Sequence, residues 1–479
     1  MNPIDVILSR FEQISAIPRG TKNEAGIRLW LQEWASQRGL RSQTDAAGNL
    51  VIYIPASVGY GDSPTLILQG HLDMVCQKTP DSSHDFTRDP IRLIRDGDWL
   101  TADGTTLGAD NGIAIALMMA LVEDESTLHP PLELLLTVEE EVGLVGANHL
   151  DPSMLSGRTL INLDSEHEGV FIVGCAGGGS VEMTLPVMWL PQSPDEVGFE
   201  IKVSGLRGGH SGEDINKHRA NADKLIACVL DFIQRDVPLR LSTLKGGNAR
   251  NAIPRDAEAV FFCSKDKADD CRTSFSNIAQ IIHAECARLE PSLFISLTEQ
   301  SEPAVQAISR EQTMAGIQLL VNVPYGVVNM AMETPNLVET SANIGVLELK
   351  QDGLFIVSSY RSSVFSRLEE MLQSVEALAW LAGAHTQRAN LNSPWQPNLD
   401  SEILKTCTGV YKSRFGAEPM VMVIHAGLEC GIISRRCGGL DTMSFGPTIE
   451  NPHSPDERLY LPSLPKVWDL QKGLLAVLV

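Results

Sequence analysis

Short buried strands alternate with a helix in the first ~185 residues, and this alternation constrains the fold more than any other feature. Three runs have the pattern of buried strands, "TLILQG" from Thr65, "LELLLTV" from Leu132 and "TLINLD" from Thr159. The segment "NGIAIALMMALVEDE" between the first two predicts a helix. Such alternation is typical of βαβ units, whose parallel strands are covered by helices. We therefore expect an α/β fold with a mostly parallel sheet.

The chain length of 479 residues predicts two domains. The segment Leu185–Gly198 contains three prolines, and after it strand and helix patterns begin again up to about residue 384. The part that follows "NSPWQPN" is too short to be a separate domain. We predict a catalytic metal-binding domain of residues 1–186 and 389–479, with an inserted two-layer α/β lid of residues 187–388.

Composition excludes several classes of partner. The net charge of −22 disfavours nucleic-acid binding, which needs clustered Lys and Arg. Nine cysteines without a CxxC pair favour a reducing compartment. The first twenty residues predict an amphipathic helix and not a signal peptide, and the longest apolar run, "GIAIALMMALV", is shorter than the roughly 20 residues that span a bilayer. We expect a cytoplasmic protein without a membrane partner.

Side chains of the kind that bind metals occur in five separate segments, and most follow a predicted strand. They are His71 and Asp73 in "LILQGHLDMV", Asp110 in "TTLGADNGIAIA", Glu139–Glu141 in "LLLTVEEEVGL", Asp164 in "INLDSEHEG" and His453 in "GPTIENPHSPDE". Ligands of α/β sheets gather at the carboxyl ends of the strands. These residues can therefore converge although they span nearly four hundred positions.

Each of these residues alone has an ordinary structural explanation. His71 can be a structural histidine, Asp110 a helix cap, and Asp164 and His453 turn or loop residues. Together, two imidazoles and three carboxylates form a ligand set for a pair of divalent metals that share one bridging carboxylate. A further free carboxylate would act as general base for water and as acid for a leaving amine.

The whole chain, in order, resembles the M20 family of dinuclear zinc peptidases, and within it the aminoacyl-histidine (Xaa-His) dipeptidases. The segments that carry the resemblance are "GHLDMV", "GTTLGADNGIA", "TVEEEVG", "INLDSE", "GGHSG", "RNAIPR", "HAGLECG" and "GPTIENPHSPDE".

The resemblance implies a role for each predicted ligand. His71 and Asp164 would bind one metal, Glu141 and His453 the other, and Asp110 would bridge them next to a cis Asp-Asn peptide. Asp73 would hydrogen-bond the second ring nitrogen of His71 and fix its tautomer.

The run of three glutamates has one acid more than the plainest family pattern. Counted back from Gly143, Glu141 matches the metal ligand and Glu140 matches the catalytic base, which leaves Glu139 without a role. Because side chains alternate along an extended segment, Glu140 and Glu141 need a local turn to face one cavity. Gly143 permits such a turn.

Four further residues match family positions outside the ligand set or face the predicted site. His210, in "LRGGHSGEDI", would stabilise the oxyanion of the tetrahedral intermediate, although a surface-loop histidine explains this motif alone equally well. Asn251 would hydrogen-bond substrate, and Arg361 would bind a substrate carboxylate or be a solvated residue at a strand end. In "HAGLECG", Gly427 would admit a substrate backbone.

Glu429, in the same motif, would meet a substrate α-ammonium group or cap a helix.

The resemblance implies hydrolysis of dipeptides and short peptides with a free N-terminus, including carnosine-like Xaa-His dipeptides. A metal-bridged hydroxide would attack the carbonyl. The implied cofactors are two divalent ions, Zn²⁺ foremost, with Mn²⁺ or Co²⁺ able to substitute. A homodimer paired through the lid is also implied. Two alternatives remain: another M20-type amidohydrolase (a carboxypeptidase or N-acyl amino acid deacylase), or an inactive peptide-binding protein, which should have lost a ligand or the base.

Overall fold

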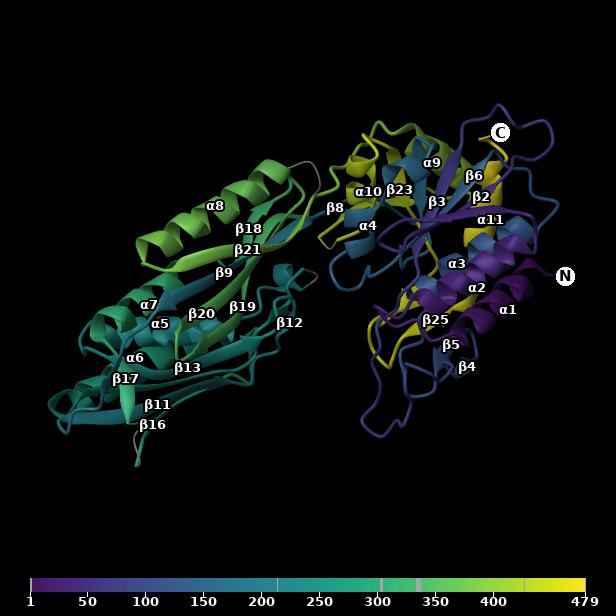
Figure 1. Ribbon diagram of the computed structural model, residues 1–479. Helices are drawn as coiled ribbons and strands as arrows, with labels where there is room; N and C mark the ends of the chain where they lie inside the picture. The colour runs from purple at the N-terminus through teal and green to yellow at the C-terminus, as the bar shows by residue number, and fades with distance from the viewer. Residues whose placement is uncertain (1, 213, 302–304, 333–336, 426, 479) are drawn as a thin grey trace. The chain divides into compact units, whose positions relative to one another are not determined.

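The computed structural model describes residues 2–212, 214–301, 305–332, 337–425 and 427–478. The chain forms two compact units (Figure 1). Unit 1 contains Met1–Cys175, Trp395–Ile424 and Leu428–Val479, and unit 2 contains Ala176–Pro394 and His425–Gly427. The chain thus leaves unit 1 and later returns to it.

Unit 1 is built on an eight-stranded sheet with the order β1-β2-β6-β3-β7-β23-β8-β22. The strands are β1 (Arg41–Thr44), β2 (Leu50–Ile54), β3 (Leu66–His71), β6 (Leu132–Thr137), β7 (Thr159–Asn162), β8 (Val170–Cys175), β22 (Met420–Ile424) and β23 (Asp441–Ser444). Strands β6, β3, β7 and β23 are successive parallel neighbours, and β8 is parallel to β22. The other pairs are antiparallel. The prediction of a mostly parallel sheet is confirmed.

The centre of this sheet is apolar because helices enclose it. Every residue of β3 and β6 is buried, as expected for central parallel strands. The helix α3 (Ala109–Glu123) is apolar around most of its circumference and packs between β3 and α1 (Pro3–Ser15). A helix that is hydrophobic all round belongs in a core, and here it carries Asp110 into the interior at its first turn.

The remaining elements of unit 1 complete its surface. The helices are α2 (Ala25–Ser36), α4 (Val145–His149), α9 (Glu402–Phe415), α10 (Cys430–Arg436) and α11 (Leu464–Leu475). A second, four-stranded sheet, which the sequence did not suggest, has the order β24 (Ile449–Glu450), β25 (Arg458–Tyr460), β5 (Trp99–Ala102) and β4 (Leu93–Asp96). The loop between β24 and β25 contains His453.

Unit 2 is a two-layer α/β structure. Its main sheet has the order β16-β11-β15-β13-β19-β20-β9-β21, and β18 pairs with β19. The strands are β9 (Gly177–Pro186), β11 (Glu196–Ser204), β13 (Arg240–Asn248), β15 (Ala257–Ser264), β16 (Phe294–Glu299), β18 (Gly326–Met330), β19 (Val338–Leu349), β20 (Gly353–Ser362) and β21 (His385–Asn392). Short pairs join β10 (Trp189–Pro191) to β17 (Gln306–Ile308) and β12 (Gly209–His210) to β14 (Ala252–Ile253).

Four helices form the second layer of unit 2: α5 (Ala222–Gln234), α6 (Ala268–Cys286), α7 (Arg310–Asn322) and α8 (Phe365–Leu381) (Figure 1). The first of these begins at Ala222 because Ile215–Lys217 is a 3-10 turn, His218 has a φ of 54°, and Asn221 caps α5 by accepting from the Lys224 N–H.

The unit boundaries differ from the expected ones. Residues 177–186 form β9, which pairs with both β20 and β21, so this segment belongs to unit 2. Residues 389–392 are the end of β21 and belong there as well. The prolines after residue 185 lie within unit 2 and do not mark its start. Among the described residues, no helix is long and apolar enough to cross a membrane.

Candidate metal centre

Three neighbouring strands of unit 1 deliver most of the predicted ligands to one edge of the sheet. His71 is the last residue of β3, Asp164 follows the end of β7, and Glu140 and Glu141 follow the end of β6. In register, His71 stands beside Thr137 of β6. Because β6, β3 and β7 are parallel, their carboxyl ends meet at this edge, as the sequence predicts.

Asp110 lies at the centre of the group. Its Oδ1 is 3.0 Å from Nε2 of His71, and its Oδ2 is 3.0 Å from Nε2 of His453. The same Nε2 atom of each histidine also faces a second carboxylate. Oδ1 of Asp164 is 3.5 Å from Nε2 of His71, and Oε2 of Glu141 is 3.1 Å from Nε2 of His453. The five side chains thus form two sets that share Asp110.

Asn111 joins the strand ends that carry two of these ligands. Its Oδ1 accepts from the His71 N–H at 3.2 Å, and its Nδ2 donates to the Leu163 carbonyl at 3.0 Å. A Cβ on Gly70 would lie 2.4 Å from this Oδ1, so the close approach requires glycine. The Asp110–Asn111 peptide is cis, as the family resemblance implies.

Asp73 orients both His71 and the glutamate segment. Its Oδ1 lies 3.3 Å from Nδ1 of His71. The same carboxylate accepts the backbone N–H groups of Glu140 at 3.0 Å and Glu141 at 3.3 Å, and the hydroxyl of Thr21 at 2.9 Å. One buried carboxylate therefore lies beside the ring of His71 and holds the backbone of two adjacent acids, the placement expected of a residue behind a metal ligand.

The glutamate run folds into a turn. Glu139 has a φ of 49°, and the carbonyl of Glu140 accepts from the N–H groups of Gly143 and Leu144. The Glu139 N–H is held by Glu24 at 3.1 Å. The local turn expected from the register of the three acids is present.

The electrostatics of this group fit a cation. Burial lowers the pKa of His71, but Asp164, Asp110 and Asp73 outweigh burial and raise it well above the usual value. Hydrogen bonds to Asp110 and Glu141 raise the pKa of His453 to about 11. Burial, opposed by His71, raises the pKa of Asp164 to about 6. The carboxylates of this group thus carry more negative charge than the two histidines can balance.

The donor atoms are also close enough for a metal. One donor atom from each of His71, Asp110 and Glu141 lies within 4.8 Å of the other two. Oε1 of Glu141 is buried without a hydrogen-bond partner. Imidazole and carboxylate donors suit Zn²⁺ and related divalent ions. The residues present therefore fit divalent metal binding.

Glu140 has a different environment from its neighbour. Burial raises the pKa of its carboxyl group well above the usual value; His71 opposes this, while Glu141, Asp164 and Glu429 add to it. A carboxyl group with a raised pKa can accept a proton and return it, which a general base that later acts as an acid must do.

Three of the residues expected to act on substrate lie together in unit 2. His210 is on β12, which pairs with β14, and the Asn251 carbonyl accepts from the Ser211 N–H at 2.8 Å. A Cβ on Gly212 would lie 3.2 Å from Cε1 of His210 and 3.3 Å from Nε of Arg361. Arg361 is on β20.

His425 belongs to the same group, and the sequence analysis missed it although it opens "HAGLECG". Its Nε2 is 2.7 Å from the Ser341 hydroxyl. Burial, followed by the charge of Arg361, lowers its pKa to about 4. His425 thus adds a second histidine beside Arg361 to the residues expected to act on substrate.

Glu429 has a different environment from the one expected for a substrate contact. Its side chain is fully buried in unit 1, where Oε2 accepts from Nε2 of Gln69 and from the Thr137 hydroxyl, both at 2.6 Å. Burial raises its pKa to about 8. Glu429 therefore joins β3 to β6 from inside the unit. It makes no side-chain cap of α10. Gly427 is grouped with unit 2 and lies beyond the end of β22.

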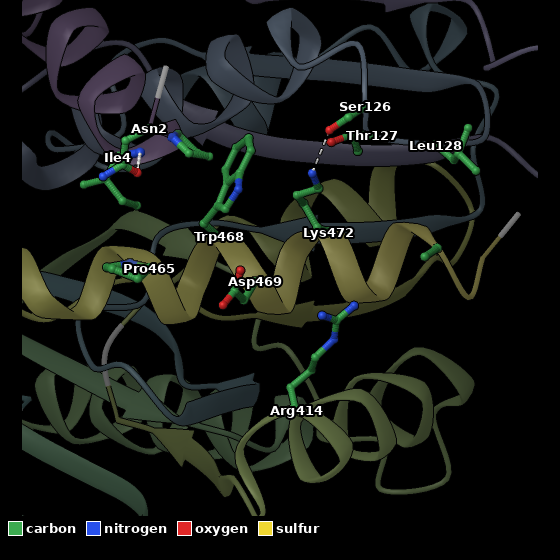
Figure 2. Close-up of a pocket in the computed structure, with 12 residues that line it drawn as sticks. Asn2, Ile4, Ser126, Thr127, Leu128, Arg414, Pro465, Trp468, Asp469 and Lys472 are labelled. Carbon is green, nitrogen blue, oxygen red and sulfur yellow. Dashed lines mark hydrogen bonds between the residues drawn. The ribbon is translucent and has the colours of Figure 1, made fainter.

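A cavity of about 510 Å³ occurs elsewhere in unit 1 (Figure 2). Its lining residues are Asn2, Pro3, Ile4, Ser126, Thr127, Leu128, Arg414, Pro465, Trp468, Asp469, Lys472 and Ala476. None of the predicted site residues lines it. Lys472, which points toward Ser126 in Figure 2, is paired with Asp124 at 2.7 Å.

The fold is that of a peptidase family. The model of Peptidase family M20/M25/M40 matches residues 67–476, and the chain belongs to this family.

Two relatives match the chain over almost its whole length. It is 37% identical over 468 residues to the cytosol non-specific dipeptidase of Escherichia coli K12, covering 97% of this chain and 96% of the relative. The crystal structure of an aminoacylhistidine dipeptidase from Vibrio alginolyticus superposes with a TM-score of 0.87 at 36% identity, covering 98% of this chain and 96% of that one. A tripeptidase from Staphylococcus aureus has a TM-score of 0.57 at 16% identity and shows the fold alone.

Proposed function

We propose that this protein is a metal-dependent dipeptidase that hydrolyses dipeptides and short peptides with a free N-terminus, Xaa-His dipeptides such as carnosine among them. The observation that carries the proposal is the pair of ligand sets around Asp110, His71 with Asp164 and His453 with Glu141. The similarity to two dipeptidases over more than 95% of each chain supports the choice of substrate.

In this proposal the five ligands hold two divalent ions, Zn²⁺ foremost, with Mn²⁺ or Co²⁺ able to substitute. Such a pair supplies Lewis-acid polarisation of a carbonyl and lowers the pKa of bound water. Asp73 keeps the Nε2 of His71 directed at Asp110 because it occupies the Nδ1 side of the ring.

Glu140 is the proton carrier. It takes the proton from the attacking water and passes it to the leaving amine, a role that its raised pKa supports. His210 donates to the carbonyl oxygen as negative charge develops there. Arg361 and Asn251 bind the substrate carboxylate and backbone, and Gly427 leaves room for the backbone.

Two further properties belong to the proposal. A cytoplasmic location is supported by the E. coli relative, which is a cytosol dipeptidase. A homodimer formed through unit 2 is supported by two exposed apolar side chains at the end of α8, Trp380 (76% exposed) and Leu381 (75% exposed). The main sheet of the same unit ends at the edge strand β21. Light scattering on the purified protein measures the oligomeric state.

A dipeptide-library assay with metal analysis on the same sample tests the function. We expect hydrolysis of free dipeptides, loss of activity on chelation and recovery with Zn²⁺, Mn²⁺ or Co²⁺. Cleavage of N-acylated amino acids but not of free dipeptides would instead assign the protein to the deacylases. Release of single C-terminal residues from long peptides would assign it to the carboxypeptidases. Metal binding without any hydrolysis would indicate an inactive peptide-binding protein.

A further inference from the structure

Two buried charged residues outside the ligand set, Arg19 and Glu457, hold the backbone around Asp110 from two directions. Arg19 follows α1 and is 2% exposed, and Glu457 directly precedes β25 and is also 2% exposed. Neither is a ligand candidate, and neither was predicted from the sequence. Charged side chains are rarely this buried unless their polar atoms are bonded.

Glu457 binds the start of the helix that carries Asp110. Its Oε2 accepts the N–H groups of Leu107 at 2.8 Å and Gly108 at 3.0 Å, and its Oε1 accepts those of Ala109 at 2.8 Å and Asp110 at 3.2 Å. Gly108 is the N-cap of α3 and has no side chain with which to cap it. Glu457 supplies the missing acceptors at the positive end of the helix.

Arg19 binds the opposite groups of the same segment. Its Nη2 donates to the Gly108 carbonyl, and its Nη1 donates to the carbonyls of Leu72 at 3.0 Å and Asp73 at 2.7 Å. Leu72 and Asp73 directly follow the ligand His71. Arg19 therefore connects the end of β3 to the start of α3.

The chain leaves space for this arginine on both sides of Asp110. A Cβ on Gly108 would lie 2.7 Å from Nη2 of Arg19, and a Cβ on Gly112 would lie 2.6 Å from the same atom. Gly108 has a φ of 70°, which also favours glycine. The position of the guanidinium is thus built into the segment 108–112.

Glu457 extends the connection to the third ligand segment. It lies four residues after His453 in the loop between β24 and β25, and its N–H donates to the Ser454 carbonyl at 3.1 Å. Through its four backbone bonds, this loop is attached to the start of α3. The segments of His71, Asp110 and His453 are therefore linked by two side chains, although none of the three is near another in sequence.

We propose that Arg19 and Glu457 are positioning residues that together fix the backbones carrying His71, Asp110 and His453, and so set the metal affinity of the site. This inference rests on the proposed function, because it assumes that those residues bind metal. It assigns to Arg19 and Glu457 no contact with substrate. Residues that orient ligands typically contribute about 10–100-fold to metal affinity or activity.

The test compares each residue with a matched buried residue away from the ligands. Glu457→Gln keeps the shape of the side chain but replaces one of its two acceptor oxygens with an amide donor, which opposes two backbone N–H groups. Its control is Glu133→Gln, because Glu133 is 3% exposed and accepts from the N–H groups of Ser156 and Gly157 at 2.9–3.1 Å.

Arg19→Lys has its own control in unit 2. Arg240 is 8% exposed and donates to backbone carbonyls, among them that of Ala307 at 3.2 Å, and to Glu196 at 3.0–3.1 Å. Arg240→Lys therefore removes the same planar donor set from an equally enclosed arginine far from any ligand in sequence.

The measurements are the zinc dissociation constant by competition with a chromophoric chelator, the absorption spectrum of the cobalt-substituted protein, and the thermal midpoint. We expect Glu457→Gln and Arg19→Lys to weaken metal binding by about 10–100-fold and to change the cobalt spectrum. The two controls should lower the thermal midpoint and leave both metal readouts unchanged. Glu457→Asp, which keeps two acceptor oxygens, should restore part of the affinity and serves if the Gln variant does not fold.

The inference is overturned if Glu457→Gln and Arg19→Lys bind zinc as tightly as the wild type while losing as much thermal stability as their controls. Its failure differs from a failure of the proposed function. If the wild type binds metal but cleaves no peptide, and the variants bind metal more weakly, then the dipeptidase proposal fails and the positioning role stands. If the wild type binds no divalent metal, both fail.

Discussion

The two clusters of predicted site residues differ in composition. The cluster in unit 1 consists of acids and histidines, most of them at the ends of parallel strands. The side chains of His71 and Glu141 are 1% and 4% exposed, whereas that of His453 is 52% exposed. The cluster in unit 2 consists of His210, Arg361 and His425, and His210 stands on a two-residue strand. An acid-rich group suits cations, whereas histidines and an arginine suit a carboxylate or a developing oxyanion. The difference predicts separate roles for the two clusters, which substitutions can test.

The largest effect should come from Glu140, the proposed proton carrier of unit 1. Glu140→Gln should lower kcat by about 10²–10⁴-fold, because an amide cannot accept the proton of the attacking water. Metal content should stay near that of the wild type. Steady-state kinetics on a dipeptide, with metal analysis, measures both.

Glu139→Gln is the matched control, since Glu139 is the adjacent acid and its N–H is held by Glu24 at 3.1 Å. It should retain nearly full activity. If Glu139→Gln loses turnover and Glu140→Gln keeps it, the register of the glutamate run is wrong by one residue.

The next effect should come from unit 2 and appear in kcat. His210→Asn should lower kcat by about 10²–10³-fold, the usual cost of removing one oxyanion donor, while metal affinity stays unchanged. His218→Asn is the control in the same segment, because His218 is exposed and its φ of 54° suits asparagine. A loss of metal in His210→Asn would show that the two clusters do not have separate roles.

Arg361 should affect binding more than turnover. Arg361→Lys should raise KM by about 10-fold for peptides with a free C-terminal carboxylate, because lysine cannot bind it bidentately. Peptides with a C-terminal amide should be affected little. Arg388→Lys on β21 is the control, since Arg388 is engaged by Glu369 and Glu376 at 2.8 Å. Equal KM changes for carboxylate and amide substrates would contradict the assignment.

The smallest expected effect concerns Asp223, a buried acid of unit 2. Burial raises the pKa of Asp223 to about 7, although the Gly247 N–H donates to it. Since its folded pKa exceeds the unfolded value of about 3.9, its stabilising contribution is full at low pH and is lost as pH rises toward 7. The free energy of unfolding of Asp223→Asn, taken relative to that of the wild type, should therefore be higher at pH 8 than at pH 5. The expected difference is about 1–3 kcal/mol.

Asp231→Asn on the same helix should behave in the opposite way. Although burial opposes it, hydrogen bonds from Arg235, Gln234 and Gln318 lower the pKa of Asp231. The stability that Asp231 contributes is present at neutral pH and is lost on acidification through its lowered folded pKa. This loss falls below the unfolded value of about 3.9, so Asp231→Asn should cost the same stability at pH 8 and pH 5 and less at pH 3. Denaturant unfolding at the three pH values measures the pair, and a cost of Asp231→Asn that does not shrink on acidification would contradict this account.

Local patterns were sufficient to predict the elements that carry the ligands. Each of β3, β6, β7 and α3 can be recognised from the apolar residues within its own short segment. The parallel arrangement of the three strands then brings His71, Asp110 and Asp164 together. The register of Glu140 and Glu141 needed the family resemblance, because charge pattern alone does not distinguish adjacent acids.

Contacts between residues that lie far apart in the sequence could not be predicted from it. Arg19 and Glu457 are separated by more than four hundred residues and resemble ordinary surface charges in "AIPRG" and "SPDE". The same is true of Glu429, whose partners Gln69 and Thr137 lie on distant strands. The unit boundaries were misplaced for a related reason: β9 and β21 are recognised as parts of unit 2 only by their pairing.

The central claim is that the side chains around Asp110 hold two divalent ions. Calorimetric titration of zinc into metal-free wild type and Glu141→Ala tests it most directly. The account predicts two tight sites in the wild type and one in Glu141→Ala, because Glu141 and His453 form one ligand set while His71 and Asp164 form the other. A single site in the wild type, or two sites of unchanged affinity in Glu141→Ala, would contradict it.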